Sequence, residues 1–229
     1  MIARAARNAL HLNREEGGPP GKRAACHAAS PPSSRINSVD AGGPRTLNRL
    51  LNQKLYTIVP HNIGAMDFQR SLENARTLAD IFEVVKSAVE QRMRRSRAGL
   101  MLGLADLGNH PQGWFGAFYP VGTNIIVMNR LPMQRIKETD PSLFKPYVFH
   151  VLLHEYLHSL GFLDEQQVRQ MAVDMTRELF GEAHPATRIA RDPMSFFPNL
   201  VYPSVNWEPE DVSIELVDGF DRSSVGYIG

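Results

Sequence analysis

The sequence predicts an α+β fold, with a small mixed sheet packed on helices. Apolar residues recur every three or four positions at residues 67 to 95 and 165 to 180, which is the period of amphipathic helices. Between these segments, short runs rich in β-branched and aromatic residues indicate strands. A length of 229 residues allows one domain with a sizeable core.

Residues 1 to 45 predict a disordered basic tail, and residues 46 to 229 the folded domain. The tail is rich in Ala, Gly, Pro, Ser and Arg, so it cannot bury enough apolar surface to offset the entropy of ordering. Residues 1 to 50 hold eight Lys or Arg against three Asp or Glu, and the other 179 hold 17 against 21. Because the folded part is mildly acidic, we expect no nucleic-acid partner.

Two features of the sequence bear on location. Cys26 is the single cysteine, so no intrachain disulfide can form and nothing indicates an oxidising compartment. The first residues lack the uninterrupted apolar stretch of a secretory signal, although an organellar presequence would also be rich in Arg and Ala. We expect a cytoplasmic protein without a membrane partner. The sequence gives no indication of its oligomeric state.

The first half of the domain predicts two strands and a long helix between them. The strand at residues 55 to 59 is β-prone and is ended by Pro60. Over residues 67 to 95 one helix face carries an apolar stripe: Phe68, Leu72, Ala75, Ala79, Phe82, Val85, Val89 and Met93. Residues 100 to 104 then predict a buried strand.

A β-hairpin comes next, with strands at residues 114 to 118 and 124 to 129 and a turn containing Pro120 and Gly122. The helix that follows, residues 146 to 161, is apolar almost all round and therefore belongs in the middle of the domain. A further helix is expected at residues 165 to 180, stopped by Gly181. A last strand is expected at residues 212 to 217.

Polar residues in the apolar helix point to a site, because buried polar groups need partners. His154 and His158 are four residues apart, so both imidazoles leave one helix face and can reach a single ion at about 2.0 to 2.1 Å. Glu155 is rotated by about 100° from His154, beside the ion, where a general base would stand. His150 lies in the same row, but three ligands along one helix would spread over roughly 12 Å, so we expect it to pack or hydrogen-bond nearby.

The simpler alternative is that the two histidines are core residues and the His-Glu-x-x-His pattern is chance. Chance produces this pattern on the order of once in a hundred chains of this size. The buried helix, the preceding hairpin and Gly161, three residues after His158, favour a metal site.

Residues 154 to 164, HEYLHSLGFLD, resemble the HExxHxxGxxD form of the zincin metallopeptidases, either metzincins of the snapalysin-like kind or minimal zincins. The resemblance covers this motif and the order hairpin, helix, glycine turn, helix. It implies a zincin-like domain with one Zn²⁺ held by His154, His158 and Asp164, with Glu155 as the base and Gly161 turning the chain. A methionine turn beneath the metal would use Met194, although a residue of this kind is more often part of the core.

Asp164 has a second interpretation, because it also stands where the helix beginning at Glu165 needs an N-cap, with Gln167 three residues on. The spacing after Gly161 nevertheless lets its carboxylate turn back toward the metal. Three other acidic residues are rival ligands: Glu165, Asp174 and Glu178.

The predicted function is a zinc-dependent peptidase that hydrolyses peptide bonds with metal-activated water, whose proton Glu155 takes and passes to the leaving amine. The peptide or protein substrate would lie along an edge strand, for which residues 124 to 129 are the candidate. Two alternatives remain: a non-catalytic, zinc-stabilised protein-binding module, and hydrolysis of a non-peptide amide. Three further residues could stabilise an oxyanion, although each is more often structural: His184, Tyr202 and Tyr156.

Overall fold

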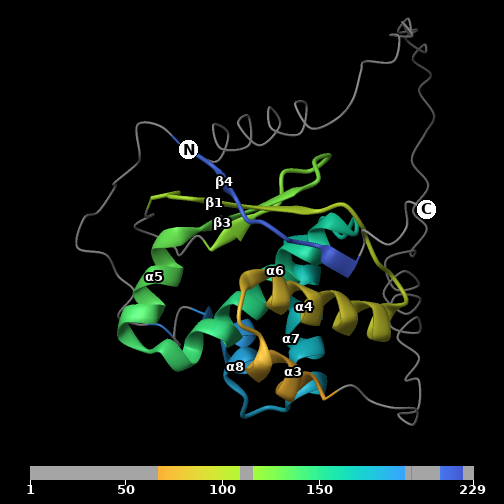
Figure 1. Cartoon of the computed structure of the whole chain (residues 1–229). Helices are drawn as coiled ribbons and strands as arrows, with labels where there is room; N and C mark the ends of the chain where they lie inside the picture. Colours follow the sequence, from red (N-terminus) through yellow and green to blue (C-terminus); the bar gives the residue numbers. More distant parts are fainter. Residues whose placement is uncertain (1–66, 109–115, 194–196, 198–211, 224–229) are drawn as a thin grey trace, which may run out of the picture. The chain divides into compact units, whose positions relative to one another are not determined.

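The computed structural model describes residues 67–108, 116–193, 197 and 212–223 (Figure 1), all of which belong to one compact unit of the chain. The predicted tail, the strand at residues 55 to 59, Met194 and Tyr202 lie outside these ranges. Within them the fold is mixed α+β, which confirms the predicted class. Its helices are α3 (Phe68–Asn74), α4 (Leu78–Met93), α5 (Arg130–Thr139), α6 (Phe144–Ser159), α7 (Glu165–Phe180) and α8 (Pro185–Arg191).

The described strands form one mixed sheet in the order β2-β3-β1-β4. They are β1 (Met101–Ala105), β2 (Ala117–Phe118), β3 (Ile125–Asn129) and β4 (Glu215–Leu216). β3 runs parallel to β1 and antiparallel to β2, so the predicted hairpin is confirmed where its residues are described. The expectation that residues 124 to 129 form an edge was wrong, because β3 lies between β2 and β1, and β2 and β4 are the edges of the described sheet.

The predicted single helix over residues 67 to 95 is two helices, α3 and α4. Thr77 starts α4 with a capping box, in which its side chain accepts from the Asp80 backbone and Asp80 accepts from the Thr77 backbone. The Asp80 carboxylate also accepts from the Arg76 amide at 2.9 Å. The apolar stripe continues across the break, with Phe68, Leu72 and Ala75 buried. An apolar period alone therefore did not reveal the new start at Thr77.

Helix α6 is the centre of the unit, as its apolar composition predicted (Figure 1). It contacts α3, α4, α5, α7, α8 and β2. One face of the sheet packs in the same core, through Leu102, Ile126 and Met128. Ile125 and Val127 point to the other face, where they join a smaller cluster with Ala105, Leu107 and Val212. β3 is thus buried on both faces, and α6 packs against the sheet in the larger core.

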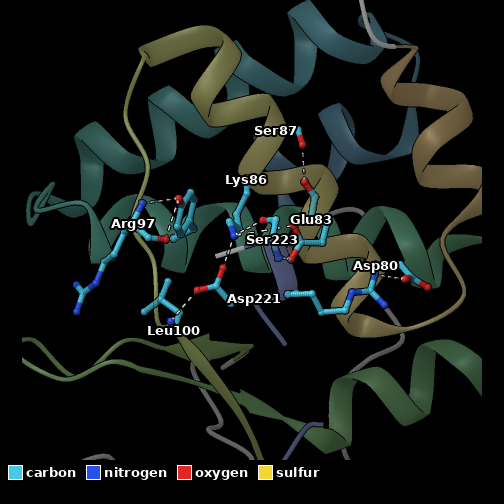
Figure 2. Close-up of polar contacts among 10 residues, drawn as sticks. Asp80, Glu83, Lys86, Ser87, Arg97, Leu100, Asp221 and Ser223 are labelled. Atoms are coloured by element: carbon cyan, nitrogen blue, oxygen red, sulfur yellow. Dashed lines mark hydrogen bonds and ion pairs between the residues drawn. The ribbon is translucent and has the colours of Figure 1, made fainter. Parts of the chain in front are cut away.

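The segment after β4 attaches to α4 through a buried ion pair (Figure 2). The Lys86 ammonium donates to the Asp221 carboxylate and, at 2.6 Å, to the Ser223 hydroxyl. Asp221 also accepts from the Leu100 amide at 2.9 Å. Phe220 stacks on Phe82 with ring centroids 4.0 Å apart. These contacts join α4, the start of β1 and the last described segment into one body.

Candidate metal centre

Two imidazoles on the last two turns of α6 point to the same place. The Nε2 atoms of His154 and His158 are 3.1 Å apart, and their side chains are 14% and 15% exposed. Burial lowers the pKa of His154, with the nearby Glu165 carboxylate opposing this effect. A lowered pKa keeps the imidazole neutral at physiological pH, which is the form that binds a metal.

The turn after α6 fixes the orientation of His158. Gly161 adopts a φ of 97°, a left-handed conformation that favours glycine, and this ends the helix and turns the chain. The turn brings the Phe162 carbonyl to 2.8 Å from His158 Nδ1. Because a carbonyl can only accept, Nδ1 carries the proton and Nε2 keeps its lone pair for a ligand.

Glu165, at the start of α7, is the acidic residue that meets both imidazoles. Its Oε2 lies 3.2 Å from His158 Nε2 and 3.4 Å from His154 Nε2. Burial alone would raise the pKa of Glu165, but the two histidines and Arg169, which donates to it at 2.9 Å, lower it below its usual value. Glu165 is therefore a carboxylate at neutral pH.

The other acidic candidates for the third ligand have different partners. Asp164 is the N-cap of α7, and its carboxylate accepts from the Gln167 amide at 2.7 Å. Asp174 pairs with Arg177 at 2.7 Å, and Glu178 pairs with Arg92. Among the described residues, a group able to hold a metal comprises His154, His158 and Glu165.

The spacing of this group fits zinc. Two ligand atoms bound about 2.1 Å from one ion at a tetrahedral angle stand about 3.4 Å apart. The separations among the two Nε2 atoms and the Glu165 oxygen are 3.1, 3.2 and 3.4 Å. Two imidazoles and one carboxylate are also a donor set of catalytic zinc sites, which keep one position open.

Glu155 stands beside the group without joining it. Its side chain is buried, with the residue 7% exposed. Burial, helped by the negative charge of Glu165, raises the pKa of Glu155 to about 8, while a hydrogen bond from the Tyr119 backbone partly opposes the rise. Tyr119 directly follows β2. Glu155 is thus in contact with the end of the edge strand.

These residues line one open cleft of about 1160 Å³. β2 and the turn after it form one wall, α7 and the end of α8 form the other, and His154, Glu155, His158 and Glu165 lie on its surface. His150 also lines the cleft. Burial lowers the pKa of His150 to about 3, and its Nδ1 has no hydrogen-bond partner in the described part of the chain.

Arg97, which the sequence did not single out, connects the edge strand to α6. Its guanidinium donates to the Ser159 carbonyl at 2.6 Å, to the Thr123 carbonyl at 2.6 Å and to the Tyr119 hydroxyl at 2.7 Å. Its backbone amide, visible in Figure 2, donates to the Tyr156 hydroxyl at 2.9 Å. No spacing rule links these positions, so only the fold could reveal the connection.

The suggested oxyanion residues that are described have structural contacts instead. The Tyr156 hydroxyl binds the Arg97 backbone, and the His184 side chain caps α8 by accepting from the Ala186 amide at 3.1 Å. Neither residue is among those that line the cleft.

Comparison of the chain with protein-family models, with curated proteins and with solved structures gave no match. Within the described residues, no helix is both long and apolar enough to cross a membrane.

Proposed function

We propose that this chain is a zinc-dependent peptidase of the zincin type. The observation that carries the proposal is the convergence of His154, His158 and Glu165 at separations of 3.1 to 3.4 Å, with the buried Glu155 next to them in an open cleft. A site with three protein ligands and a neighbouring carboxylic acid is suited to hydrolysis, whereas a structural zinc site closes with a fourth ligand.

We assign the third ligand to Glu165 in place of Asp164. The motif then becomes HExxHxxGxxxE, which departs by one residue from the HExxHxxGxxD pattern that the sequence resembles. The resemblance to zincins is still supported by the order of the elements, which is hairpin, buried helix, glycine turn and second helix. The α+β class and the antiparallel edge strand beside α6 are also compatible with a zincin-like domain.

The metal, Glu155 and β2 would each have a separate role in hydrolysis. A bound zinc ion would supply Lewis acidity toward the scissile carbonyl and make water acidic enough to lose a proton at neutral pH. Glu155 accepts that proton and returns it to the amine that leaves. No described strand pairs with the outer edge of β2, so this edge can offer backbone donors and acceptors to an extended peptide, and β2 lines the cleft.

The test combines metal analysis with digestion of a broad peptide library. We expect the purified protein to hold one zinc ion and to cleave peptides, and Glu155→Gln to retain zinc while losing cleavage. His154→Ala is the matched variant that should lose both. Hydrolysis by Glu155→Gln at the wild-type rate would contradict the assignment of the base. A zinc-loaded wild type without any activity would instead favour the protein-binding module.

A further inference from the structure

A second pocket, of about 510 Å³, lies apart from the candidate metal centre. Its residues come from the turn between α3 and α4, the start of α4, β1, α5 and the start of α6, and none of them lines the metal cleft. Lys145, which lines the pocket, precedes His154 by nine residues on α6, which corresponds to about 14 Å along the helix. The proposed peptidase site therefore does not account for this pocket.

The interior of this pocket is apolar. Six side chains of the larger core contribute to its lining: Ala75, Leu78, Ile81, Leu104, Met133 and Phe144. They are buried or half-buried, and the strongly exposed large apolar side chains of the described chain, Val121 and Leu163, lie elsewhere. The apolar surface of the pocket is thus recessed, so a narrow apolar chain can reach it more easily than a flat partner can. A recessed pocket of this size is typical of small-molecule sites.

Cationic side chains accompany this apolar surface without a carboxylate among them. The described lining contains no Asp or Glu, but it contains four basic residues: Arg76, Arg130, Lys137 and Lys145. Arg130 is compensated by an ion pair with Glu215. The other three side chains form no ion pair within the described part of the chain. The pocket therefore carries uncompensated positive charge, which attracts an anion.

Two of the uncompensated cations have contacts that leave donors for a ligand. The Lys145 ammonium donates to the Glu73 backbone carbonyl, which is neutral, and keeps two of its three N–H groups. The Lys137 ammonium lies over the Phe144 ring, with Nζ 4.4 Å from the ring centroid. Because Phe144 lines the pocket, this contact holds a cation directly against the apolar surface. A ligand that suits both features needs an anionic head on an apolar body.

The surroundings of the pocket favour a lipid over a peptide. β1 lies between β3 and β4, so Leu104 offers its side chain but no free strand edge. The other described lining residues belong to helices and to the turn before α4, where Asp80 already accepts from the Arg76 and Thr77 amides. An extended peptide would therefore find no row of backbone partners here.

We propose that this pocket binds a fatty acid. Its acyl chain lies among the apolar side chains, and its carboxylate accepts from Arg76, Lys137 and Lys145. The proposal is independent of the metal and of peptide hydrolysis, so each can hold or fail without the other.

Isothermal titration calorimetry of the full chain with decanoate, octanoate and decan-1-ol tests both parts of the site. Decanoate should bind about tenfold more tightly than octanoate, because it buries two more methylenes. It should also bind about tenfold more tightly than decanol at about 50 mM NaCl, and this second difference should shrink at about 500 mM. Arg76→Gln, Lys137→Gln and Lys145→Gln combined should reduce the affinity for decanoate to the level of decanol.

The matched control combines Arg70→Gln, Arg177→Gln and Arg191→Gln, which removes the same charge from three exposed residues outside the pocket. It should leave the affinity for decanoate unchanged. Equal binding of decanoate and decanol would overturn the inference, as would wild-type affinity for decanoate in the variant that lacks the three pocket cations.

Two further measurements exclude other sites for the anion. Each titration is repeated with EDTA, since binding of decanoate only in the presence of zinc would assign the carboxylate to the metal centre and overturn the inference. Sedimentation with phosphatidylglycerol vesicles tests a membrane surface as the partner. Binding to these vesicles without binding of dispersed decanoate would replace the fatty acid by a membrane.

Discussion

The carboxylate of Glu165 lies 3.2 Å from the Nε2 atom of His158, whereas the carboxylate of Asp164 points to the backbone and accepts from the Gln167 amide at 2.7 Å. Two adjacent acidic residues thus have separate roles at the start of α7. From the sequence, the spacing after Gly161 favoured Asp164 as the metal ligand, with capping by Asp164 and ligation by Glu165 as the alternatives. Their difference follows from α7 beginning at Glu165, because an N-cap side chain must turn back over its own helix.

This division predicts that substitutions at Glu165 and at Asp164 differ in their effect on zinc affinity. Glu165→Ala should weaken zinc binding strongly, because one of three ligands is lost. Asp164→Ala should cost about 1 kcal/mol of folding stability, and Asp164→Asn almost none, because Asn caps as well as Asp. Neither change at Asp164 should alter the affinity. Zinc titration with a competing chelator, beside urea unfolding of the zinc-free proteins, measures both quantities.

The reverse pattern would return the ligand to Asp164. A loss of zinc affinity in both Asp164 variants, with Glu165→Ala unaffected, would mean that α7 unwinds at its first turn when the metal binds. Glu165→Asp is a useful variant between wild type and Glu165→Ala, since it keeps the negative charge but its side chain is shorter by one methylene.

Arg97 provides a second prediction, on the rigidity of the edge strand. It is the donor that joins the Thr123 carbonyl after β2 to the Ser159 carbonyl at the end of α6. Arg97→Ala should therefore speed amide hydrogen exchange in residues 116 to 124, while the zinc content stays unchanged. Tyr119→Phe removes a single contact of the network and should have a smaller effect. If exchange in these residues were the same in wild type and Arg97→Ala, the strand would be held by its pairing with β3 alone.

The parts of the fold that the sequence predicted are those set by local pattern. The apolar helix around His154, the helix ended by Gly181 and the hairpin turn all follow from residues close together in the chain. The break at Thr77 and the position of β3 inside the sheet depend on contacts that periodicity does not encode. Helices α5 and α8 are short and were not predicted. In the site, the histidine pair follows from helix geometry, whereas the contact of Glu165 depends on how the chain turns after Gly161.

The raised pKa of Glu155 makes a third prediction, on the stability of the zinc-free protein. A pKa of about 8 in the folded chain, above the usual 4.5, means that the folded state holds the proton more tightly than the unfolded state. This contribution to stability is complete below pH 4.5 and is lost as the pH rises to about 8. Glu155→Gln has no such loss, so its stability should exceed that of the wild type by an amount that grows with pH.

At pH 7 the expected gain is of the order of 3 kcal/mol, from about 1.4 kcal/mol per pH unit. Urea unfolding of chelator-treated wild type and Glu155→Gln at several pH values between 5 and 8 measures it. Zinc should reduce the difference, because a nearby positive charge favours the ionised carboxylate. Parallel stability curves for the two proteins would show that Glu155 is ionised in the folded chain without zinc.

The last prediction concerns Lys86 and Asp221, which join α4 to the segment after β4. Their side chains are 9% and 2% exposed, and Glu83 also lies 3.9 Å from the Lys86 ammonium. Lys86→Met leaves the Asp221 carboxylate buried without its cation and should cost about 3 to 5 kcal/mol. Asp221→Asn suits the φ of 57° at this position, since Asn tolerates the left-handed conformation, and it can still accept from the Leu100 amide.

The double variant decides whether the pair acts as a unit. The double variant, Lys86→Met with Asp221→Asn, removes both charges. Its loss of folding free energy should therefore be smaller than the sum of the losses in the two single variants. The difference is the coupling free energy of the pair. Urea unfolding of the four proteins gives that value. Strict additivity would mean that the two charges do not stabilise each other. The other contacts of the segment with α4, among them the stacking of Phe220 on Phe82, would then hold it, and Phe220→Leu tests that stacking separately.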